Sequence, residues 1–292
     1  MSDPQSANPK NPESASSESA SATADAASFV VATWNVNSLR MRMPRLLPWL
    51  AEHKPDVVCL QEIKLQEPDF PLVELLSAGY HAVALGQKTY NGVAVLSRVE
   101  HGAPTQVVAG LQDDDADPES RLLAATIPGL GVRVASVYVP QGQEIDSDKF
   151  AYKQRFLARL LGYLERRAAS ATASEPLLLC GDYNIAPDDL DVYDPIGWRN
   201  TVITHSDVRQ AFERLKALGY VDTLRKLLPG QSIYSYWDYR GLSFPKNLGL
   251  RIDHILAPLE LAERCTQAWV DRQARKGEKP SDHAPVLARF RR

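Results

Sequence analysis

Short apolar runs recur along the chain from residue 29 onward, and turn residues or amphipathic stretches separate them. Runs of about four to eight residues rich in Val, Ile, Leu and aromatic side chains are typical of β-strands. They predict strands over 29–34, 56–62, 80–84, 92–97, 121–127, 132–139, 177–182, 251–256 and 285–290. Several of these strands are close enough in sequence to pair as antiparallel hairpins.

Other stretches repeat their apolar residues with the helical period. Residues 44–52 and 149–167 each place leucines on one face, and the second stretch predicts the longest helix. A further helix should begin at Ser206, as its N-cap, and stop at Gly219. Helices interleaved with hairpins predict an α+β fold, in which two mainly antiparallel sheets pack face to face with the helices outside.

The first 27 residues differ from the rest of the chain in composition. They are mainly Ser, Ala, Asn, Pro, Asp and Glu without a hydrophobic period, so burial could not offset the entropy lost on ordering. They also lack the basic and apolar regions of a secretory signal. We therefore expect a disordered, acidic tail over 1–27 and one folded domain over 28–292.

Composition and charge narrow the class of protein. The 292 residues are 44% hydrophobic and 24% charged, which suits a globular protein with a large core. The longest apolar runs have four residues, far below the ~18 to 20 that a membrane span needs, so no membrane association is expected. Cys59, Cys180 and Cys265 show no CxxC spacing and predict free, buried thiols of a reducing cytoplasm.

The net charge of −3 lies in the tail, which carries one lysine and four acidic residues. The folded part is therefore neutral overall, and this is compatible with a local anion-binding face.

Polar side chains gather where the predicted strands begin or end. Because side chains alternate along a strand, residues two apart should share a face. The pairs expected on common faces are Asn35 with Asn37, Asp182 with Asn184, and Arg251 with Asp253. By the same rule, His254 should point away from Asp253 and into the packed interior.

Four carboxylates beside these apolar segments indicate a metal site. They are Glu62, Asp182, Asp253 and Asp282. Crowded carboxylates raise one another's pKa values unless a cation neutralises them. Oxygen ligands without a cysteine or multi-histidine set favour Mg²⁺, for which Mn²⁺ can substitute, over zinc. Each carboxylate taken alone could instead cap a helix or pair with an arginine.

Seven short motifs carry these polar residues in a fixed order. They read WNVNSLR from Trp34, QEIK from Gln61, YVPQG from Tyr138, GDYN from Gly181, YWDYR from Tyr236, RIDH from Arg251 and KPSDHAPV from Lys279. The ordered set resembles the exodeoxyribonuclease III and AP endonuclease family, within the endonuclease/exonuclease/phosphatase superfamily, over about residues 29–292. This resemblance implies a four-layered αββα sandwich and Mg²⁺-dependent hydrolysis of DNA phosphodiesters.

The resemblance also implies the activities and partners of the chain. They are 3′-to-5′ exonuclease action, cleaning of blocked 3′ ends, and incision beside abasic sites. The partner would be double-stranded DNA with abasic sites, nicks or recessed 3′ ends, and the enzyme would be a monomer.

Roles of single residues follow from the same resemblance. The metal ligands would be Asn35, Glu62, Asp182, Asn184, Asp282 and His283. Asp182 would activate or orient the attacking water, and Asn184 would hold the scissile phosphate or that water. His283, held by Asp253, would contact a phosphate oxygen. Tyr138 would donate to the phosphate or assist the leaving group.

DNA contacts are expected from loops around the strand ends, since cationic side chains there can bind phosphates without reading sequence. The candidates are Arg40, Lys64, Lys88, Tyr90, Tyr236, Trp237, Arg240, Lys246 and Leu250. Arg42 and Arg45 should join them. Tyr236, Trp237 and Leu250 could form a pocket for a displaced sugar, although the aromatic pair could instead be ordinary core.

Two other functions remain open at this point. A phosphomonoesterase or phospholipase of the same superfamily would place histidine where this chain has Tyr138. The second alternative is a catalytically silent nucleic-acid-binding protein on the same fold. In such a protein the crowded carboxylates would bind no metal and would only lower stability.

Overall fold

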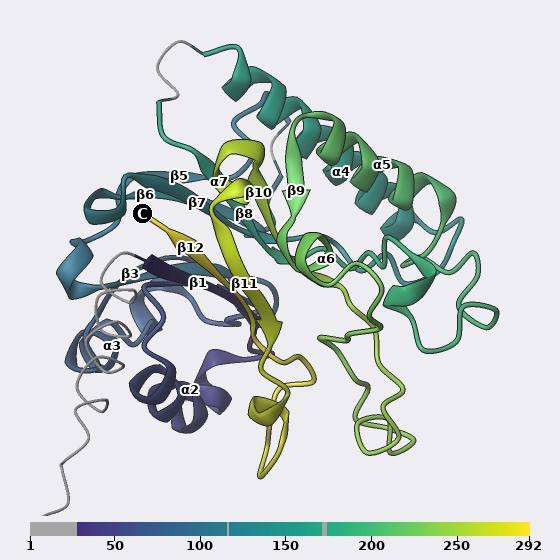
Figure 1. The fold of residues 1–292 in the computed structure, drawn as a ribbon, viewed down its shortest axis with the longest axis horizontal. Coiled ribbons are helices and arrows are strands. Elements are labelled where there is room, and N and C mark those ends of the chain that lie inside the picture. Colours follow the sequence, from purple (N-terminus) through teal and green to yellow (C-terminus); the bar gives the residue numbers. More distant parts are fainter. Residues whose placement is uncertain (1–27, 116, 171–173) are drawn as a thin grey trace, which may run out of the picture.

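The computed structural model describes residues 28–115, 117–170 and 174–292, and within them the strands form two six-stranded sheets (Figure 1). The first sheet has the order β11 (Cys265–Val270), β12 (Val286–Arg291), β1 (Ser28–Asn35), β2 (Val57–Gln61), β4 (Val93–Arg98) and β3 (Tyr80–Leu85). The second has the order β5 (Thr105–Ala109), β6 (Leu122–Ile127), β7 (Val132–Tyr138), β8 (Leu177–Asp182), β10 (Asp253–Pro258) and β9 (Tyr220–Asp222).

Helices cover the outer faces of the two sheets. Figure 1 shows α2 and α3 outside the first sheet and α4 and α5 outside the second. The helices are α2 (Leu39–His53), α3 (Leu72–Ser77), α4 (Asp148–Ala168), α5 (Ser206–Ala217), α6 (Thr223–Leu227) and α7 (Leu259–Glu263). Single 3₁₀ turns occupy Glu67–Asp69, Val99–His101, Pro128–Leu130, Asp189–Asp191 and Arg272–Arg275.

Strand β1 shows how the alternation of side chains builds the layers. Phe29 and Val31 point into the core between the sheets, whereas Val30 and Ala32 pack in the core that includes side chains of α2 and α3. A third core joins the second sheet to α4 and α5. Both faces of each sheet are therefore covered, and the predicted α+β, four-layered αββα sandwich is confirmed.

The strand directions bring the polar ends of several strands to one edge. β1 runs parallel to β2, and β7 runs parallel to β8 with Tyr138 opposite Asp182. β10 is antiparallel to β8 and begins with Asp253, again opposite Asp182. Carboxyl ends of parallel strands lie at the same edge, so the residues after β1, β2, β7 and β8 collect beside the start of β10.

The apolar pattern predicted the long, buried elements and missed short or exposed ones. The strand over 177–182 matches β8, and the helix over 149–167 matches α4 within one residue at each end. The pattern missed β5, β9, β11, α3, α6 and α7, which have only three to six residues each. Such elements form because the rest of the fold supports them, and their own sequence signal is weak.

Two helix boundaries need correction, and one prediction lies outside the described residues. α2 begins at Leu39 and contains Pro44 in its interior, although a proline usually marks a helix start. The N-cap of α5 is His205, whose side chain accepts from the backbone N–H of Asp207, and Ser206 is the first helical residue. The tail predicted over 1–27 lies outside the described residues.

Candidate active site

The centre of the candidate site is the side-chain amide of Asn35, at the end of β1. Its Nδ2 donates to Glu62 Oε1 at 2.8 Å and to Asp182 Oδ2 at 2.9 Å. Glu62 follows β2 with a left-handed backbone, φ 49°, and Asp182 is the last residue of β8. The amide thus links one carboxylate from each sheet. We call Glu62 and Asp182 the acidic centre.

An aspartate–histidine pair lies beside the acidic centre. His283 Nδ1 is 2.9 Å from Asp253 Oδ2, and its Nε2 is 3.8 Å from Asp182 Oδ2. Ser235 Oγ donates to the same Asp253 oxygen at 2.6 Å. Burial by itself would lower the pKa of His283, but Asp253 and Asp182 raise it to about 10. The ring is therefore cationic at neutral pH: its Nδ1 donates to Asp253, and its Nε2 carries a proton that no hydrogen bond within the described residues engages.

Asn184 and Tyr138 stand on two further sides of the acidic centre. The backbone N–H of Asn184 donates to Asp182 Oδ1 at 2.9 Å, and its Nδ2 donates to the Val139 carbonyl at 3.0 Å. Burial, together with the charges of Glu62 and Asp182, raises the pKa of Tyr138 well above its usual range. Tyr138 therefore keeps its proton and can act as a donor.

Asp282 joins the site through Asn37 and Lys64. Asn37 Nδ2 donates to Asp282 Oδ1 at 3.0 Å, and Asn37 Oδ1 accepts from Lys64 Nζ at 2.6 Å. Lys64 Nζ also lies 2.8 Å from Glu62 Oε2. Lys64, which the sequence placed among the DNA contacts, is thus engaged with the acidic centre.

The charges of the site fit a divalent cation. Burial, and then the charge of Asp253, raise the pKa of Asp182 to about 7 against the opposing effect of His283. Burial would also raise the pKa of Glu62. The charge of Lys64 and the hydrogen bonds that Glu62 accepts outweigh this effect, so the pKa of Glu62 is lowered. A cation on these oxygens would replace the proton and relieve the crowding. Oxygen donors of this kind suit Mg²⁺ or Mn²⁺.

Three residues predicted to contact DNA are exposed on segments beside the acidic centre. They are Arg40, Lys88 and Tyr90. The backbone N–H of Lys64 donates to the Asn91 carbonyl at 2.9 Å, which places the loop of Lys88 and Tyr90 next to the site. The backbone N–H of Ser38, two residues before Arg40, donates to the Glu62 carbonyl at 2.8 Å.

The loop over 236–248 adjoins the other side of the site. The backbone N–H of Trp237 donates to the Asp282 carbonyl at 3.0 Å. The ring of Tyr236 is half-buried, with its centroid 4.9 Å from that of His283. Exposed cationic side chains on this loop are Arg240 and Lys246.

The structure corrects the sugar pocket predicted from Tyr236, Trp237 and Leu250. Trp237 and Leu250 are each 1% exposed. The Trp237 ring meets Phe244 edge to face, with centroids 5.2 Å apart, and so forms the interior of its own loop. Large apolar side chains are more stable when packed against each other than when left at the surface. Of the three residues, Tyr236 alone is half-buried and presents surface to a ligand.

Arg42 and Arg45 are structural, in contrast to the prediction that they contact DNA. Arg42 is buried, and its Nη2 donates to the hydroxyl of Tyr239 at 2.8 Å. Arg45 donates to the carbonyl of Glu278 at 2.8 Å and to two further carbonyls. Through these Nη donors, both side chains fasten α2 to distant loops, which gives them a structural role within the fold.

Arg251 does not share a face with Asp253, in contrast to the prediction from alternation. Its Nε donates to Asp191 Oδ1 and its Nη1 to Asp222 Oδ2, each at 2.6 Å. β10 begins only at Asp253, so the alternation does not extend back to Arg251. His254 is buried on the side away from Asp253, as predicted, and its Nδ1 lies 3.1 Å from Arg251 Nη1.

The sequence gives little signal for the residues that support the site. Ser235 fixes Asp253, and Ser281 Oγ donates to the Asn35 carbonyl at 2.7 Å. Between the sheets, Gln61, the residue before Glu62, donates from Nε2 to Ser136 Oγ at 2.9 Å. Gln61 could have been found from the sequence, because it is a polar residue in an apolar strand directly before a predicted metal ligand. Ser235 and Ser281 lie in loops, where a serine gives no such signal.

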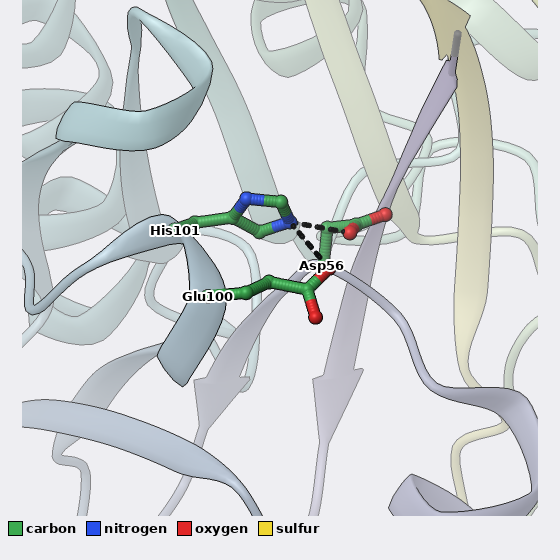
Figure 2. A group of neighbouring side chains, drawn as sticks. All are labelled: Asp56, Glu100 and His101. Carbon is green, nitrogen blue, oxygen red and sulfur yellow. Dashed lines mark hydrogen bonds and ion pairs between the residues drawn. The ribbon is translucent and has the colours of Figure 1, made fainter. Parts of the chain in front are cut away.

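Asp56, Glu100 and His101 form a second group of potential metal ligands, at the amino end of β2 (Figure 2). His101 Nε2 lies 2.6 Å from Asp56 Oδ1 and 3.6 Å from Glu100 Oε1. Arg98 contacts both carboxylates, at 3.5 and 2.8 Å, and the backbone N–H of Val30 donates to Asp56 Oδ2 at 2.7 Å. Arg98 supplies the positive charge that a metal would otherwise bring. This group is therefore an ion-pair network that links β1, β2 and β4 of the first sheet.

Buried carboxylates beside an aspartate–histidine pair, at one edge of an αββα sandwich, define a metal-dependent phosphoester hydrolase. The model of the Endonuclease/Exonuclease/phosphatase family matches residues 32–283. Exodeoxyribonuclease III of Haemophilus influenzae is 38% identical over 272 residues, which cover 89% of this chain and 98% of that protein.

Two solved structures are also similar to this chain. An AP endonuclease from Archaeoglobus fulgidus has a TM-score of 0.83 and 42% identity, and the match covers 90% of this chain and 99% of that one. The 3′ phosphatase NExo from Neisseria, solved with a product DNA hairpin, has a TM-score of 0.84 and 43% identity with the same coverage.

The chain therefore belongs to the Endonuclease/Exonuclease/phosphatase family, and within it to the exodeoxyribonuclease III and AP endonuclease group. It is a DNA repair nuclease that cleaves phosphodiesters with a divalent metal. The predicted family, fold and enzyme class are confirmed. The roles of individual residues stay predictions.

Proposed function

We propose that this chain hydrolyses phosphodiesters of double-stranded DNA as a Mg²⁺-dependent repair enzyme. Its activities would be 3′-to-5′ exonuclease action, cleaning of blocked 3′ ends and incision beside abasic sites. Its substrates would carry abasic sites, nicks or recessed 3′ ends. The observation that carries the proposal is the amide of Asn35, which joins Glu62 to Asp182 next to the cationic ring of His283. The three relatives named above are an exodeoxyribonuclease, an AP endonuclease and a 3′ phosphatase.

Mg²⁺, for which Mn²⁺ can substitute, fits the oxygen donors of this site. Glu62 would be the principal ligand, with Asn35 beside it. The further candidate ligands are Asp182, Asn184 and Asp282. His283 was also predicted as a ligand, but a cationic ring has no lone pair to offer a metal. When bound, the ion supplies positive charge to phosphate oxygens that become more negative in the transition state.

The side chains of this chain would supply the proton and donor chemistry. Asp182 would orient the attacking water and take its proton. His283, held by Asp253, would donate from Nε2 to a phosphate oxygen. Tyr138 keeps its proton and would donate to the phosphate or the leaving oxygen. Asn184 has one amide N–H engaged by a carbonyl, and the other would hold the phosphate or the water.

The surroundings of the site support the DNA partner. Exposed side chains on the adjoining loops would bind backbone phosphates, and the half-buried Tyr236 would meet the nucleotide next to His283. The candidates for the phosphate contacts are Arg40, Lys88, Arg240 and Lys246, with Tyr90 beside them.

We also propose that the enzyme acts as a monomer in the cytoplasm. The three cysteines are free and buried, which is compatible with a reducing compartment. In the part of the chain that the structure describes, no helix combines the length and apolar character needed to cross a membrane.

A panel of matched substrates tests the proposal. It comprises a duplex with a recessed 3′ end, the same duplex ending in a 3′ phosphate, a duplex with one abasic site, and a soluble inositol phosphate. We expect Mg²⁺-dependent, EDTA-inhibited cleavage of the three DNA substrates and no action on the fourth. Release of phosphate from inositol phosphate without DNA cleavage would identify a phosphomonoesterase instead. DNA binding without any cleavage would identify a silent binding protein.

A further inference from the structure

Lys153, in the first turns of α4, is a buried lysine that the chemistry above does not use. Its side chain has no exposed surface. Its Nζ donates to three main-chain carbonyls, those of Asn184 at 2.6 Å, Val202 at 2.7 Å and Gln141 at 3.3 Å. An ammonium group has three N–H donors, and its burial is costly unless all of them are paired. The number of carbonyls matches the number of donors.

Each of the three carbonyls belongs to a different loop around the site. Asn184 ends the turn that follows Asp182, and Gln141 follows Tyr138 by three residues. Val202 lies in the segment before α5, where the next carbonyl, of Ile203, accepts from the backbone N–H of residue 186 at 3.1 Å. Lys153 therefore ties the turn that carries Asn184 to the loop that follows Tyr138, the last residue of β7.

Gly142, the last residue of the YVPQG motif, shows that this loop is built around the lysine. Its φ is +98°, in the left-handed region that favours glycine. A Cβ at this position would lie 3.2 Å from Lys153 Cδ and 3.3 Å from Val202 Cβ. Glycine thus lets the backbone pass closely over the lysine stem. The motif and the buried lysine form one packed unit.

We propose that Lys153 is a positioning residue for the nuclease reaction, whose three hydrogen bonds hold the Asn184 turn and the 140–142 loop in fixed register. The inference rests on the roles proposed above for Asn184 and Tyr138. Asn184 has a left-handed backbone, φ 50°, and its N–H donates to Asp182 Oδ1. Without the lysine, three buried carbonyls lose their donor, and the turn can relax to a more common conformation. The amide of Asn184 would then move relative to Asp182.

The first test is Lys153→Met, which keeps the apolar stem and removes the three donors. A displacement of about 1 Å at a reacting group can cost ~10²-fold in rate. We expect kcat on a recessed 3′ end to fall ~10- to 100-fold, whereas KM and the affinity for DNA in EDTA change less than about threefold, because the exposed phosphate contacts remain. Lys226→Met is the matched control, since Lys226 on α6 also donates to a main-chain carbonyl, that of Ala262, outside the site. Its kcat should equal that of the parent.

A cycle with Asn184→Ala separates positioning from general destabilisation. If Lys153 acts through Asn184, Lys153→Met should lower kcat by less than about threefold once Asn184 is alanine. Should Lys153→Met not fold, Gly142→Ala carries the test, because it keeps the amine but displaces the loop from the lysine stem. It should lower kcat in the same way.

Parent-like kcat in folded Lys153→Met, or in Gly142→Ala if only that variant folds, would overturn the inference. Full additivity of Lys153→Met and Asn184→Ala would also overturn it. A parent protein that fails to cleave DNA in Mg²⁺ would instead refute the proposed function, so the two failures are distinguishable.

Discussion

Replacing Asp253 by asparagine should lower DNA cleavage by ~10² to 10⁴ and leave DNA binding nearly unchanged. The substitution keeps the size of the side chain and removes a charge 2.9 Å from His283 Nδ1. Ser235 Oγ donates to this carboxylate at 2.6 Å, and an asparagine can keep that bond through its oxygen. The amide nitrogen of the asparagine would then face His283. Because this nitrogen donates a hydrogen bond, it favours a His283 ring that has no proton on Nδ1.

The expected magnitude follows from the charge on His283. Burial opposes that charge, and Asp253 and Asp182 together raise the pKa of the ring to about 10. Losing the Asp253 carboxylate lowers this pKa, so less of the cationic donor is present at neutral pH. The predicted loss corresponds to about 2.7 to 5.4 kcal/mol of transition-state stabilisation, similar to the removal of an oxyanion donor. The rate of the variant should also fall as pH rises through neutrality, where the His283 ring of the parent stays charged.

Single-turnover cleavage of an end-labelled duplex with a recessed 3′ end measures this effect. In a double-mutant cycle, Asp253→Asn should add little once His283 is alanine, since the carboxylate acts through the ring. DNA affinity in EDTA should stay within about threefold, because many phosphate contacts share the binding. Full additivity of the two losses would mean that Asp253 serves separately, for example as a metal ligand, and the proposed pair would have to be abandoned.

Two further predictions concern the tail and the fold. Deleting residues 1–27 should leave activity within about twofold, because the segment has no core-forming pattern; a large loss at unchanged melting temperature would show that it helps bind substrate. Asp222→Asn should destabilise the fold by about 1 to 3 kcal/mol, because it removes one of the two carboxylates that pair with the buried Arg251 and leaves Asp191 in place. Burial would raise the pKa of Asp222, but Arg251 and then His254 bring it well below its usual range. The contribution of Asp222 is therefore complete above its unfolded pKa of about 3.9 and declines as pH falls toward the folded value. In urea unfolding, variant and parent should differ less at pH 3 than at pH 6, and an equal difference would contradict the assignment.

The sequence predicts those parts of the site that depend on the strand ends. Asn35, Glu62 and Asp182 each follow a strongly apolar run, and buried strands are the best-defined local pattern. Their convergence, however, depends on two parallel pairs and on the packing of one sheet against the other. The periodicity of a single strand carries no information about that packing.

What could not be predicted is the partner of each long polar side chain. Lys64 follows Glu62 by two residues, and the sequence does not show whether its ammonium contacts DNA or the carboxylate. Lys153 lies on the buried face of a helix, beside Phe150 and Phe156, where the helical period predicts an inward position but not the three carbonyls that accept from it. Trp237 lies in a polar loop that suggests exposure, whereas its burial depends on the distant side chain of Arg272 as well as on Phe244.

The central claim is that the metal binds at Glu62 and Asp182, the carboxylates that Asn35 links. The most direct test compares the parent protein with Glu62→Ala. The measurement is the release of mononucleotides from a recessed 3′ end by EDTA-treated protein, as a function of added Mg²⁺. The parent should regain activity with Mg²⁺, whereas folded Glu62→Ala should release nucleotides at least ~100-fold more slowly and gain less thermal stability from Mg²⁺. Activity of Glu62→Ala at the parent's level, with an unchanged Mg²⁺ dependence, would place the metal elsewhere.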